Sequence, residues 1–565
     1  MQLRRLTVER FRGIRSLTWD VNGPILCLVG PGDATKTTIL DAIEWTLWPR
    51  PMLSVGDADF HGITCDHPIL IEATVGELPD RLRRDDLFGL ELRGWSSEGE
   101  LHDEPDDADE EVLTVRLTVD DSLDPTWEIV NDRRSEPRLV RARDREAFGV
   151  ARLGPDIERH LTWARGSALS RVTADTDDVH RVLAAASRRA REMVKGEALE
   201  DLAQVADKAT DAARRLGATG DEYRPAMDPG AATAGAGALA LHQGDIPARL
   251  AGTGSRRLTA LAVQKLSVPE GAIVLVDEVE SGLEPHRLRH LLRELAATPD
   301  EGARGQVLTT THSPVALTEL PCRDLRIVRC VDGDTSIRNV PEELQGLVRA
   351  EPGALLCERL LVCEGKTELG IIRRLQRGWT DMHDSTPPEH LGVTIALGNG
   401  NEAPRRALAL AGLGYGVALL ADSDQPLTPD ADTLEAAGVR VIQWDDGKST
   451  ELRVALDLPF ESVGRILDVA AELDGRGRQR VDDALAARLS GPVPASVDPL
   501  GLLEAGFSEE DIRSAIGRVS LEKEWFKRID WGEALGDLIL EQLPQILDTD
   551  LARKLAEAEA WVYAP

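Results

Sequence analysis

The chain has 565 residues and a net charge of −32, with 42% hydrophobic and 29% charged residues. This composition is that of a folded protein, and at about 150 residues per domain the length predicts three or four domains. The acidity argues against a protein that coats nucleic acid through bulk positive charge, although metal ions can still neutralise phosphate at a local site.

The N-terminus, MQLRRLTVERFRG, is charged and lacks the apolar core of a secretory signal. The longest apolar runs, such as 272–276, are much shorter than the ~20 residues that cross a bilayer. We therefore expect a cytoplasmic protein without a membrane segment. The cysteines form no CxxC pair and no zinc pattern, and we expect small buried thiols. They are Cys27, Cys65, Cys322, Cys330, Cys357 and Cys363.

The first part of the chain alternates strand patterns with one amphipathic helix. The acidic run from Glu100 to Glu111 is typical of a solvated hairpin tip, with a partner-binding tail as the alternative. The periodicity predicts a helix from Lys36 to Leu47 and strands at 3–8, 24–29, 69–75, 112–119 and 127–130.

The middle of the chain changes in composition. Residues 173–217 are rich in Ala, Arg and Glu with helical periodicity, which predicts a helical insertion that forms an arm or a dimer surface. Residues 225–240 have the composition of a Gly/Ala-rich loop. An apolar strand at 273–276, a helix at 285–296 and a strand at 306–310 follow.

From about residue 359, strands and helices alternate, which predicts a mostly parallel sheet. The chain becomes mainly helical from about residue 452. We expect strands at 360–363, 393–397, 417–421 and 439–443, with helices at 368–376 and 402–412.

The residues Gly30-Pro-Gly-Asp-Ala-Thr-Lys36-Thr lie between a strand and a helix and nearly match GxxxxGK[ST]. Such a loop cradles phosphates, its lysine reaches the outer phosphates, and the next hydroxyl binds Mg²⁺. Thr35 replaces the motif's glycine, where a Cβ strains a positive φ or crowds the phosphate. Taken alone, a plain strand–helix turn explains the segment equally well. The expected nucleotide-binding residues here are Gly30, Gly32, Asp33, Thr35, Lys36, Thr37 and Thr38.

Two later strands end on residues that suit nucleotide hydrolysis. Asp277 and Glu278 follow an apolar strand, where Asp277 would hold Mg²⁺ and Glu278 would polarise the attacking water. His312 follows the next strand, where it would sense the γ-phosphate. The alternatives are a strand that stops on two charges and a surface histidine.

This order of motifs resembles the ABC-type ATPases of the SMC and RecF-like group. Residues 252–257 (Gly-Thr-Gly-Ser-Arg-Arg) resemble the signature segment that caps the nucleotide of a second subunit, so the resemblance implies a dimer. The segment 49–60 stands in the place of the Q-loop; it has no glutamine, and Asp57 and Asp59 are the candidates there.

A second set of acids follows two strands of the later α/β unit. Glu364 ends one strand in a Glu-Gly turn, and Asp422 and Asp424 end another as Asp-x-Asp. Carboxylates at the carboxyl ends of neighbouring parallel strands converge on one crevice and chelate Mg²⁺ there, and two such ions clamp a phosphodiester. This is the pattern of a Toprim domain. The alternative is a doubly wound domain whose loop ends are acidic but bind no metal.

An ABC-type ATPase followed by a Toprim domain resembles the OLD (overcoming lysogenization defect) family of ATP-dependent nucleases over nearly the whole chain. The resemblance makes the helical insertion a dimerisation element and adds Ser449 and Glu451 as a further metal group. It assigns to Lys527 the stabilisation of transition-state charge. Lys523 is a rival, and Trp525 and Phe526 equally suit plain packing. The expected metal ligands are Glu364, Glu368, Asp422, Asp424, Ser449, Glu451, Thr37 and Asp277, and the expected catalytic residues are Glu364, Asp422, Asp424, Lys527 and Glu278.

The expected fold is therefore α/β: an ABC-type ATPase domain at 1–345 with a helical insertion at about 165–225, then a doubly wound Toprim domain with a helical C-terminal part at 346–565. The expected function is an ATP-binding, Mg²⁺- or Mn²⁺-dependent DNA endonuclease in anti-phage defence, with ATPase activity weakened by Thr35. The expected assembly is a homodimer or higher homo-oligomer, with a helicase or other defence protein as a further partner. The alternatives are a nucleotide-sensing scaffold and a RecF-like repair factor without nuclease activity.

The net charge predicts weak nonspecific affinity for DNA that depends on divalent metal. We expect a local basic track to hold the DNA, and its candidates are Arg256, Arg257, Lys527 and Arg528.

Overall fold

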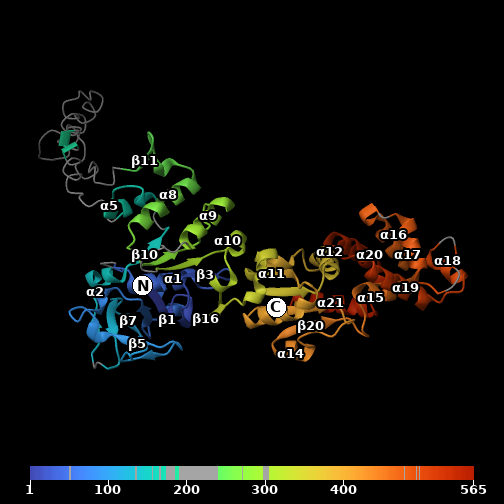
Figure 1. Ribbon diagram of the computed structural model, residues 1–565, viewed down its shortest axis with the longest axis horizontal. Helices are drawn as coiled ribbons and strands as arrows, with labels where there is room; N and C mark the ends of the chain where they lie inside the picture. Colours follow the sequence, from blue (N-terminus) through green and yellow to red (C-terminus); the bar gives the residue numbers. More distant parts are fainter. Residues whose placement is uncertain are drawn as a thin grey trace, which may run out of the picture.

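A computed structural model shows an elongated molecule whose N-terminal lobe holds a large sheet and whose C-terminal lobe holds a small one (Figure 1). The predicted helical insertion and the Gly/Ala-rich segment lie largely outside the described residues. The structure describes residues 1–49, 53–133, 136–154, 157–164, 167–172, 185–186, 188–189, 240–269, 271–296, 305–475, 477–490, 493–494 and 497–564.

The large sheet is mixed, and its described strands number 14, in the order β10-β13-β14-β3-β15-β16-β2-β1-β4-β7-β5-β6 with β8 and β9 beyond β7. Its strands are β1 (Gln2–Phe11), β2 (Ile14–Asp20), β3 (Ile25–Val29), β4 (Ile69–Gly76), β5 (Arg93–Trp95), β6 (Leu101–His102), β7 (Glu110–Val119), β8 (Thr126–Val130), β9 (Arg138–Leu139), β10 (Val150–Leu153), β13 (Ile273–Val276), β14 (Gln306–Thr310), β15 (Leu325–Val331) and β16 (Asp334–Asn339). A separate hairpin joins β11 (His242–Gln243) to β12 (Ile246–Pro247).

The five strands β10, β13, β14, β3 and β15 run parallel. All five residues of β3 are buried, as a parallel strand covered on both faces requires. Because the carboxyl ends of parallel strands meet at one edge, the loops after β3, β13 and β14 lie together. This edge carries the segments that the sequence assigns to nucleotide.

Helix α1 (Lys36–Leu47) has the predicted bounds and buries Ile39, Leu40 and Ile43 against the sheet. It starts at the carboxyl end of β3, so its N-terminus points to the same sheet edge. The other helices of this lobe are α2 (Asp80–Arg83), α3 (Ala142–Arg145), α4 (Ile157–His160), α5 (Ala168–Val172), α8 (Thr253–Leu266), α9 (Pro285–Ala296) and α10 (Pro314–Glu319).

The small sheet is parallel, in the order β18-β17-β19-β20. Alternate residues of β17 face two different apolar clusters: Leu361 packs with α12, and Leu360 packs with α13. Helices therefore cover both faces of the sheet, and the first and third strands lie side by side at its centre. The elements are β17 (Arg359–Cys363), α12 (Lys366–Met382), β18 (Val393–Leu397), α13 (Ala403–Gly412), β19 (Gly416–Ala421), α14 (Ala431–Ala436) and β20 (Val439–Gln443).

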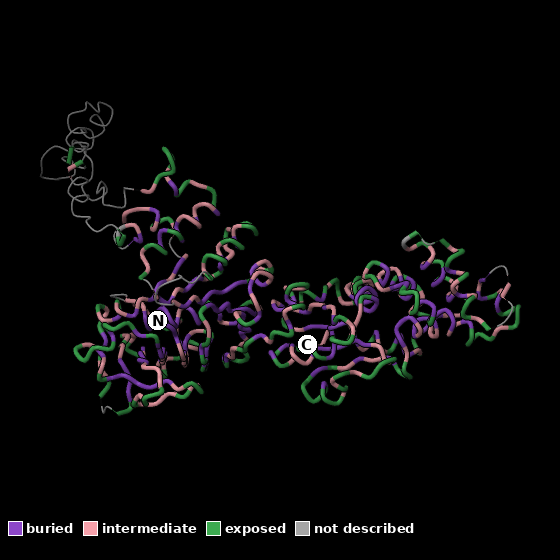
Figure 2. Tube along the Cα trace, viewed as in Figure 1, coloured by how far each residue is buried: buried purple, intermediate pink, exposed green. Residues whose placement is uncertain are grey.

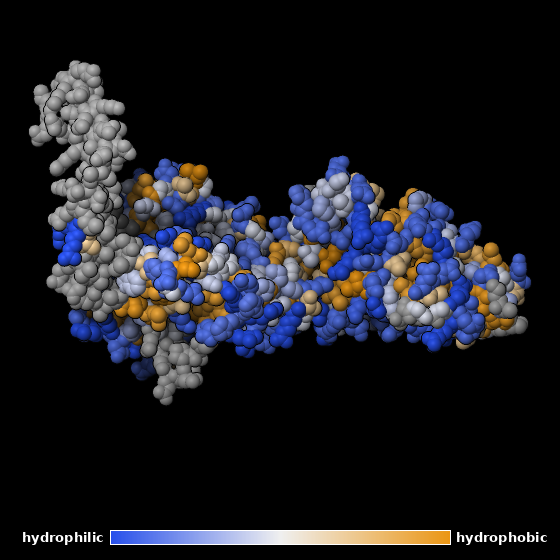
Figure 3. Space-filling model, turned by 90° about the horizontal axis from the view of Figure 1, so that it is seen from above, coloured by the Kyte–Doolittle hydropathy of each residue, from blue (hydrophilic) through white to orange (hydrophobic). Residues whose placement is uncertain are grey.

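The C-terminal part is helical, as predicted. Helix α20 (Ile529–Gln542) lies against α12 with Gly370 facing Gly532, where a Cβ on Gly370 would come within 2.6 Å of the Gly532 Cα. Leu500 and Leu503 of α18 (Pro499–Glu504) are exposed, and Figure 3 shows hydrophobic colour at the far end of the C-terminal lobe. The helices are α15 (Thr450–Asp457), α16 (Phe460–Glu472), α17 (Arg478–Ala486), α18 (Pro499–Glu504), α19 (Glu509–Glu522), α20 (Ile529–Gln542) and α21 (Asp550–Val562).

One apolar cluster joins the two lobes. It includes Val29 and Ile327 of the large sheet, Leu347 of α11 (Gln345–Ala350), and Leu360 and Leu419 of the small sheet. The buried trace in Figure 2 runs through the sheet strands of both lobes. The lobes therefore share apolar core residues around α11.

Two arginines add polar contacts between the lobes. The Arg329 guanidinium of β15 lies 3.8 Å from the ring centre of buried Tyr415, and Arg338 of β16 donates to the Gly412 carbonyl at 2.6 Å. Separately, a search of the described helices finds none with the length and apolarity needed to cross a bilayer.

Candidate functional sites

The loop between β3 and α1 has the backbone of a phosphate-binding loop. A Cβ at Gly30 would lie 2.5 Å from the Val328 carbonyl oxygen, so a glycine is required there. Asp33 and Thr35 both have positive φ, 56° and 63°. Of the two effects expected for Thr35, strain at a positive φ is the one that the structure shows, because a β-branched residue is strained in that region.

Lys36 lies inside this loop. Its ammonium donates to the carbonyl oxygens of Gly30 at 3.1 Å and Pro31 at 2.6 Å. Burial lowers the pKa of Lys36 to about 8, although the negative charges of Asp277 and Asp33 oppose that shift. A phosphate group bound in the loop would replace the carbonyl contacts and restore the usual preference for the charged form.

Thr37 and Asp277 lie together across the sheet edge. The Thr37 hydroxyl donates to Asp277 Oδ1 at 3.2 Å, and the Thr310 hydroxyl donates to the same oxygen at 2.5 Å. Arg152 of β10 donates to Asp277 Oδ2 at 3.0 Å. In P-loop sites, Mg²⁺ is held by the hydroxyl that follows the P-loop lysine and by an acid at the end of another strand of the sheet. Here that strand is β13, two places from β3 in the sheet. These residues fit Mg²⁺ with ATP.

Glu278 and His312 are both exposed beside Asp277. Glu278 has φ 44°, and its backbone N–H donates to the Thr310 hydroxyl at 2.8 Å. Glu280 holds the histidine segment, because it accepts from the His312 N–H and the Thr311 hydroxyl, both at 2.7 Å. Sequence reasoning missed Glu280, Thr310 and Arg152.

The remaining loop residues take outer positions. Gly32 and Asp33 are exposed at the tip, and Thr38 is half-buried in the first turn of α1. Asp59, a candidate for the Q-loop role, pairs with Arg12 at 2.9 Å and accepts from the Gly56 N–H. Among the contacts of the described chain, neither Asp57 nor Asp59 touches the phosphate loop.

The signature-like segment begins α8, with Gly252 as its N-cap. Arg257 is buried, and its guanidinium donates to the carbonyl oxygens of Asp277 at 3.2 Å and Glu278 at 2.8 Å. The expectation that Arg257 belongs to a DNA-facing track is wrong, because its N–H groups hold the Asp-Glu turn. Arg256 pairs with Glu158 at 3.3 Å.

The second candidate site lies at the carboxyl ends of β17 and β19, where the strand order of the small sheet reverses. Ligands of open α/β sheets bind at this kind of crevice. Glu364 follows β17 and Asp422 follows β19, and the Asp422 N–H donates to Glu364 Oε2 at 2.8 Å. The structure therefore brings these two predicted residues into direct contact.

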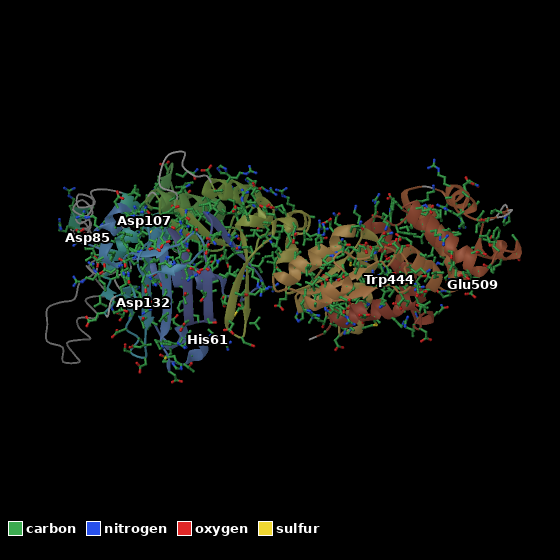
Figure 4. The ribbon with its side chains drawn as sticks, turned by 60° about the horizontal axis from the view of Figure 1, so that its bottom comes forward. His61, Asp85, Asp107, Asp132, Trp444 and Glu509 are labelled. Atoms are coloured by element: carbon green, nitrogen blue, oxygen red, sulfur yellow. The ribbon has the colours of Figure 1, made fainter. Side chains whose placement is uncertain are left out.

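Glu451 and Thr450 reach the same place from the start of α15. The Thr450 hydroxyl and N–H donate to Asp422 Oδ1 at 2.5 and 2.7 Å, and Trp444 Nε1 donates to that hydroxyl at 2.7 Å. Figure 4 labels Trp444 in this lobe. Ser449 instead caps α15 by accepting from the Leu452 N–H. The hydroxyl that contacts Asp422 is therefore that of Thr450, one residue beyond the predicted Ser449.

Glu368 and Lys527 complete the site. Glu368 Oε2 accepts from the Gly365 N–H at 2.8 Å, and Glu451 Oε1 lies 3.4 Å from the Lys527 ammonium and accepts from the Thr367 hydroxyl at 3.2 Å. The other oxygens, Glu368 Oε1 and Glu451 Oε2, are buried and have no hydrogen-bond partner. Buried carboxylate oxygens without donors fit a divalent cation, which binds such ligands.

Burial and mutual repulsion raise the pKa values of acids in this group. Burial raises the pKa of Asp422 to about 9, and the charges of Glu368, Glu451 and Glu364 add to that rise. Burial likewise raises the pKa of Glu364 and of Glu451. Burial opposes the charged form of Lys527, yet the charges of Glu451, Glu368 and Asp422 raise its pKa above the usual value.

Asp424 is exposed beside this group. Of the two lysines that the sequence offered for the catalytic role, Lys527 contacts Glu451, whereas Lys523 is exposed. The ligand atoms of the group are more widely spread than those of a single-ion cage. In the part of the chain that the structure describes, His102, Asp106 and Asp109 of the acidic hairpin have ligand atoms within 4.8 Å of one another, and His102 Nδ1 pairs with Asp109 Oδ2 at 2.7 Å. That ion pair holds the hairpin that the acidic run forms between β6 and β7.

The fold and the first site define a P-loop ATPase of the ABC type, with the phosphate loop, the Asp-Glu strand end and the histidine strand end on one sheet edge. Residues 25–318 match the family model described as "AAA domain, putative AbiEii toxin, Type IV TA system", and the chain belongs to that family.

Among the solved structures that match this chain are SMC head domains of low sequence identity. The SMC head domain from Thermotoga maritima is 17% identical, with a TM-score of 0.29, over 60% of this chain and 100% of that one. The Pyrococcus furiosus Smc head domain with an extended coiled coil, bound to the C-terminal domain of ScpA, is 13% identical, with a TM-score of 0.35, over 62% and 99%. A search of curated proteins finds no match.

Proposed function

We propose that this protein is a divalent-metal-dependent DNA endonuclease of the OLD type, in which a Toprim site cuts phosphodiester bonds under the control of the ATPase site. The observation that carries the proposal is the pair of buried, partnerless oxygens of Glu368 and Glu451 beside Glu364 and Asp422. A group that only packs the fold has no use for such oxygens, because each leaves a polar atom unsatisfied.

The residues divide into ligands and a charge-stabilising group. Glu364, Glu368, Asp422, Asp424 and Glu451 would hold Mg²⁺ or Mn²⁺, which supplies an activated water and stabilises the leaving oxygen when bound. The Thr450 hydroxyl orients Asp422. Lys527, held by Glu451, would neutralise charge that develops on the phosphate. The resemblance to the OLD family selects DNA as the substrate and anti-phage defence as the role.

The same resemblance supports an assembly. In this proposal the segment 252–257 of one subunit caps the nucleotide of another, so the active form is a homodimer or larger homo-oligomer, and a helicase or other defence protein is a further partner. Nucleotide binding would then change how the Toprim sites of the two subunits face the DNA.

The test is nicking of supercoiled plasmid with Mg²⁺, Mn²⁺ or EDTA, with and without ATP. Metal supplies several kcal/mol of stabilisation, so Asp422→Asn should cut at least about a hundredfold more slowly. The matched control is Asp432→Asn, which removes an exposed acid of α14, a helix that packs against β20 of the same sheet. Full metal-dependent nicking by Asp422→Asn would overturn the assignment.

A nucleotide-sensing scaffold is the second candidate, and the left-handed Thr35 favours it. A strained residue in the phosphate loop suits a site that binds nucleotide without efficient turnover. Wild-type ATP turnover no faster than that of Glu278→Gln, together with absent nicking, would support the scaffold over the nuclease.

A further inference from the structure

Arg152 is a buried cation at the edge of the nucleotide site that the sequence motifs do not include. It lies on β10, paired in register with Leu275 of β13, one residue before the carboxyl end of each strand. Its side chain is 7% exposed, and its NH2 group donates to Asp277 Oδ2 at 3.0 Å. The guanidinium thus lies against the acid that P-loop sites use for the divalent cation.

The Asp277 carboxylate separates Arg152 from the predicted cation position. Asp277 Oδ2 accepts from Arg152, while Oδ1 accepts from the hydroxyls of Thr37 and Thr310. Thr37 is the residue expected to bind Mg²⁺ directly. The positive charge of Arg152 therefore lies against one oxygen of Asp277, and the two hydroxyls lie against the other.

The guanidinium of Arg152 keeps unused hydrogen-bond capacity. Its Nε and NH1 groups are buried and have no hydrogen-bond acceptor, although NH1 lies 3.3 Å from Asp41 Oδ1 and 3.9 Å from Glu44 Oε2. An arginine carries five N–H donors in a planar fork that suits phosphate oxygens. Buried donors without acceptors are costly, so a ligand that supplies acceptors would bind favourably.

Acids of α1 hold Arg152 in this place. Asp41 and Glu44 face it from one side and Asp277 from the other, and Arg12 pairs with the second oxygen of Asp41. Arg12 belongs to the same network but pairs with Asp41 and Asp59 rather than with Asp277. This makes Arg12 a matched control for the loss of one positive charge.

We propose that Arg152 supplies a built-in positive charge for the phosphates of a bound nucleoside triphosphate, so that the site binds nucleotide with little dependence on divalent cation. Arg152 neutralises Asp277, which weakens the attraction of that acid for Mg²⁺. At the same time Arg152 offsets part of the phosphate charge that Mg²⁺ otherwise offsets. The inference concerns nucleotide binding alone and does not depend on the nuclease proposed above.

The experiment is a titration of the full-length protein with a fluorescent ATP analogue, in excess Mg²⁺ and in EDTA. Wild-type affinity should fall by less than about tenfold when Mg²⁺ is removed. In Arg152→Gln the fall should be at least about fivefold larger than in wild type, while Arg12→Gln should keep the wild-type ratio.

Four other results would each overturn the role proposed for Arg152. Equal ratios in wild type and Arg152→Gln overturn the inference, and so does an Arg12→Gln ratio that matches that of Arg152→Gln. If circular dichroism shows that Arg152→Gln is unfolded, the wild-type ratio decides, and a fall of tenfold or more overturns the inference. No nucleotide binding by wild type under either condition overturns both this inference and the nucleotide site, whereas plasmid nicking tests the nuclease separately.

Discussion

The two candidate sites both lie at the carboxyl ends of parallel strands, but they differ in how many hydrogen-bond donors their carboxylates have. In the nucleotide site, Asp277 has three donors, and an arginine is among them. In the site on the small sheet, Glu368 and Glu451 each keep a buried oxygen without any donor. The acid of the first site is therefore fully paired by its neighbours, whereas the second site, even with Lys527 beside Glu451, keeps free oxygens that a bound metal ion would satisfy.

The largest expected effect comes from Lys527, the lysine that contacts Glu451 in the second site. Lys527→Ala should lower metal-dependent nicking roughly 10²- to 10³-fold, because a fixed charge that stabilises the reacting phosphate is worth about that much. Steady-state plasmid nicking measures the loss. Lys523→Ala removes an exposed lysine of the same segment and should keep the wild-type rate. Equal losses in the two variants would remove Lys527 from the site.

A smaller effect should follow from loss of the hydroxyl that orients Asp422. Thr450→Val keeps the shape of the side chain but removes the bond to Asp422 Oδ1. Groups that orient a metal ligand are worth roughly 10- to 100-fold in metal affinity. A Mn²⁺ titration by calorimetry measures that affinity, and Thr433→Val of α14, whose side chain lies outside the site, is the control. Unchanged Mn²⁺ affinity would mean that Thr450 is only a structural partner.

The stability of the metal-free protein should depend on pH through Asp422 of the second site. The pKa of Asp422 is raised to about 9, so its protonated form stabilises the metal-free fold, and this stabilisation is lost as pH rises from about 4 through 9. The melting temperature in EDTA should thus fall by roughly 5 °C between pH 6 and pH 9, and Mn²⁺ should restore more of it at pH 9 than at pH 6. Asp422→Asn should lack both effects. A wild-type melting temperature independent of pH and Mn²⁺ would contradict the repulsion inferred for these acids.

The smallest expected effect concerns the strain in the nucleotide loop. Thr35→Gly relieves a left-handed backbone that costs about 1–2 kcal/mol for an L-residue, offset by about 0.5–1 kcal/mol of extra glycine entropy. We expect a gain in the free energy of unfolding of up to about 1 kcal/mol, measured by urea denaturation. Thr38→Gly, in the helix itself, should destabilise the fold instead. A loss of stability in Thr35→Gly would show that the threonine contacts outweigh the strain.

Periodicity predicted the helix and strands that carry the sites, because apolar spacing decides which face is buried. The helix from Lys36 to Leu47 and the strands at 273–276 and 306–310 have the predicted bounds. Strand β10 was missed, because its four residues include an arginine that looks solvent-exposed in the sequence. The hairpin of β15 and β16 was also missed, although it lies beside the P-loop strand.

The site residues that escaped sequence reasoning act through tertiary contacts. Arg152 reaches Asp277 only because β10 pairs with β13, more than 100 residues further along the chain. Thr450 and Ser449 are adjacent hydroxyls, and helix geometry decides that Ser449 caps α15 while Thr450 turns toward Asp422. No spacing rule distinguishes two such neighbours.

The stacking of Arg329 on Tyr415 has a consequence for how the protein can be divided. Arg329 lies on β15, which pairs with the P-loop strand, and Tyr415 directly precedes β19, which leads to Asp422. Cutting the chain near residue 345 would uncover this ring and the apolar residues around α11 on both fragments. Separately expressed halves would then expose hydrophobic surface and aggregate, whereas two halves produced together would reassociate through that surface.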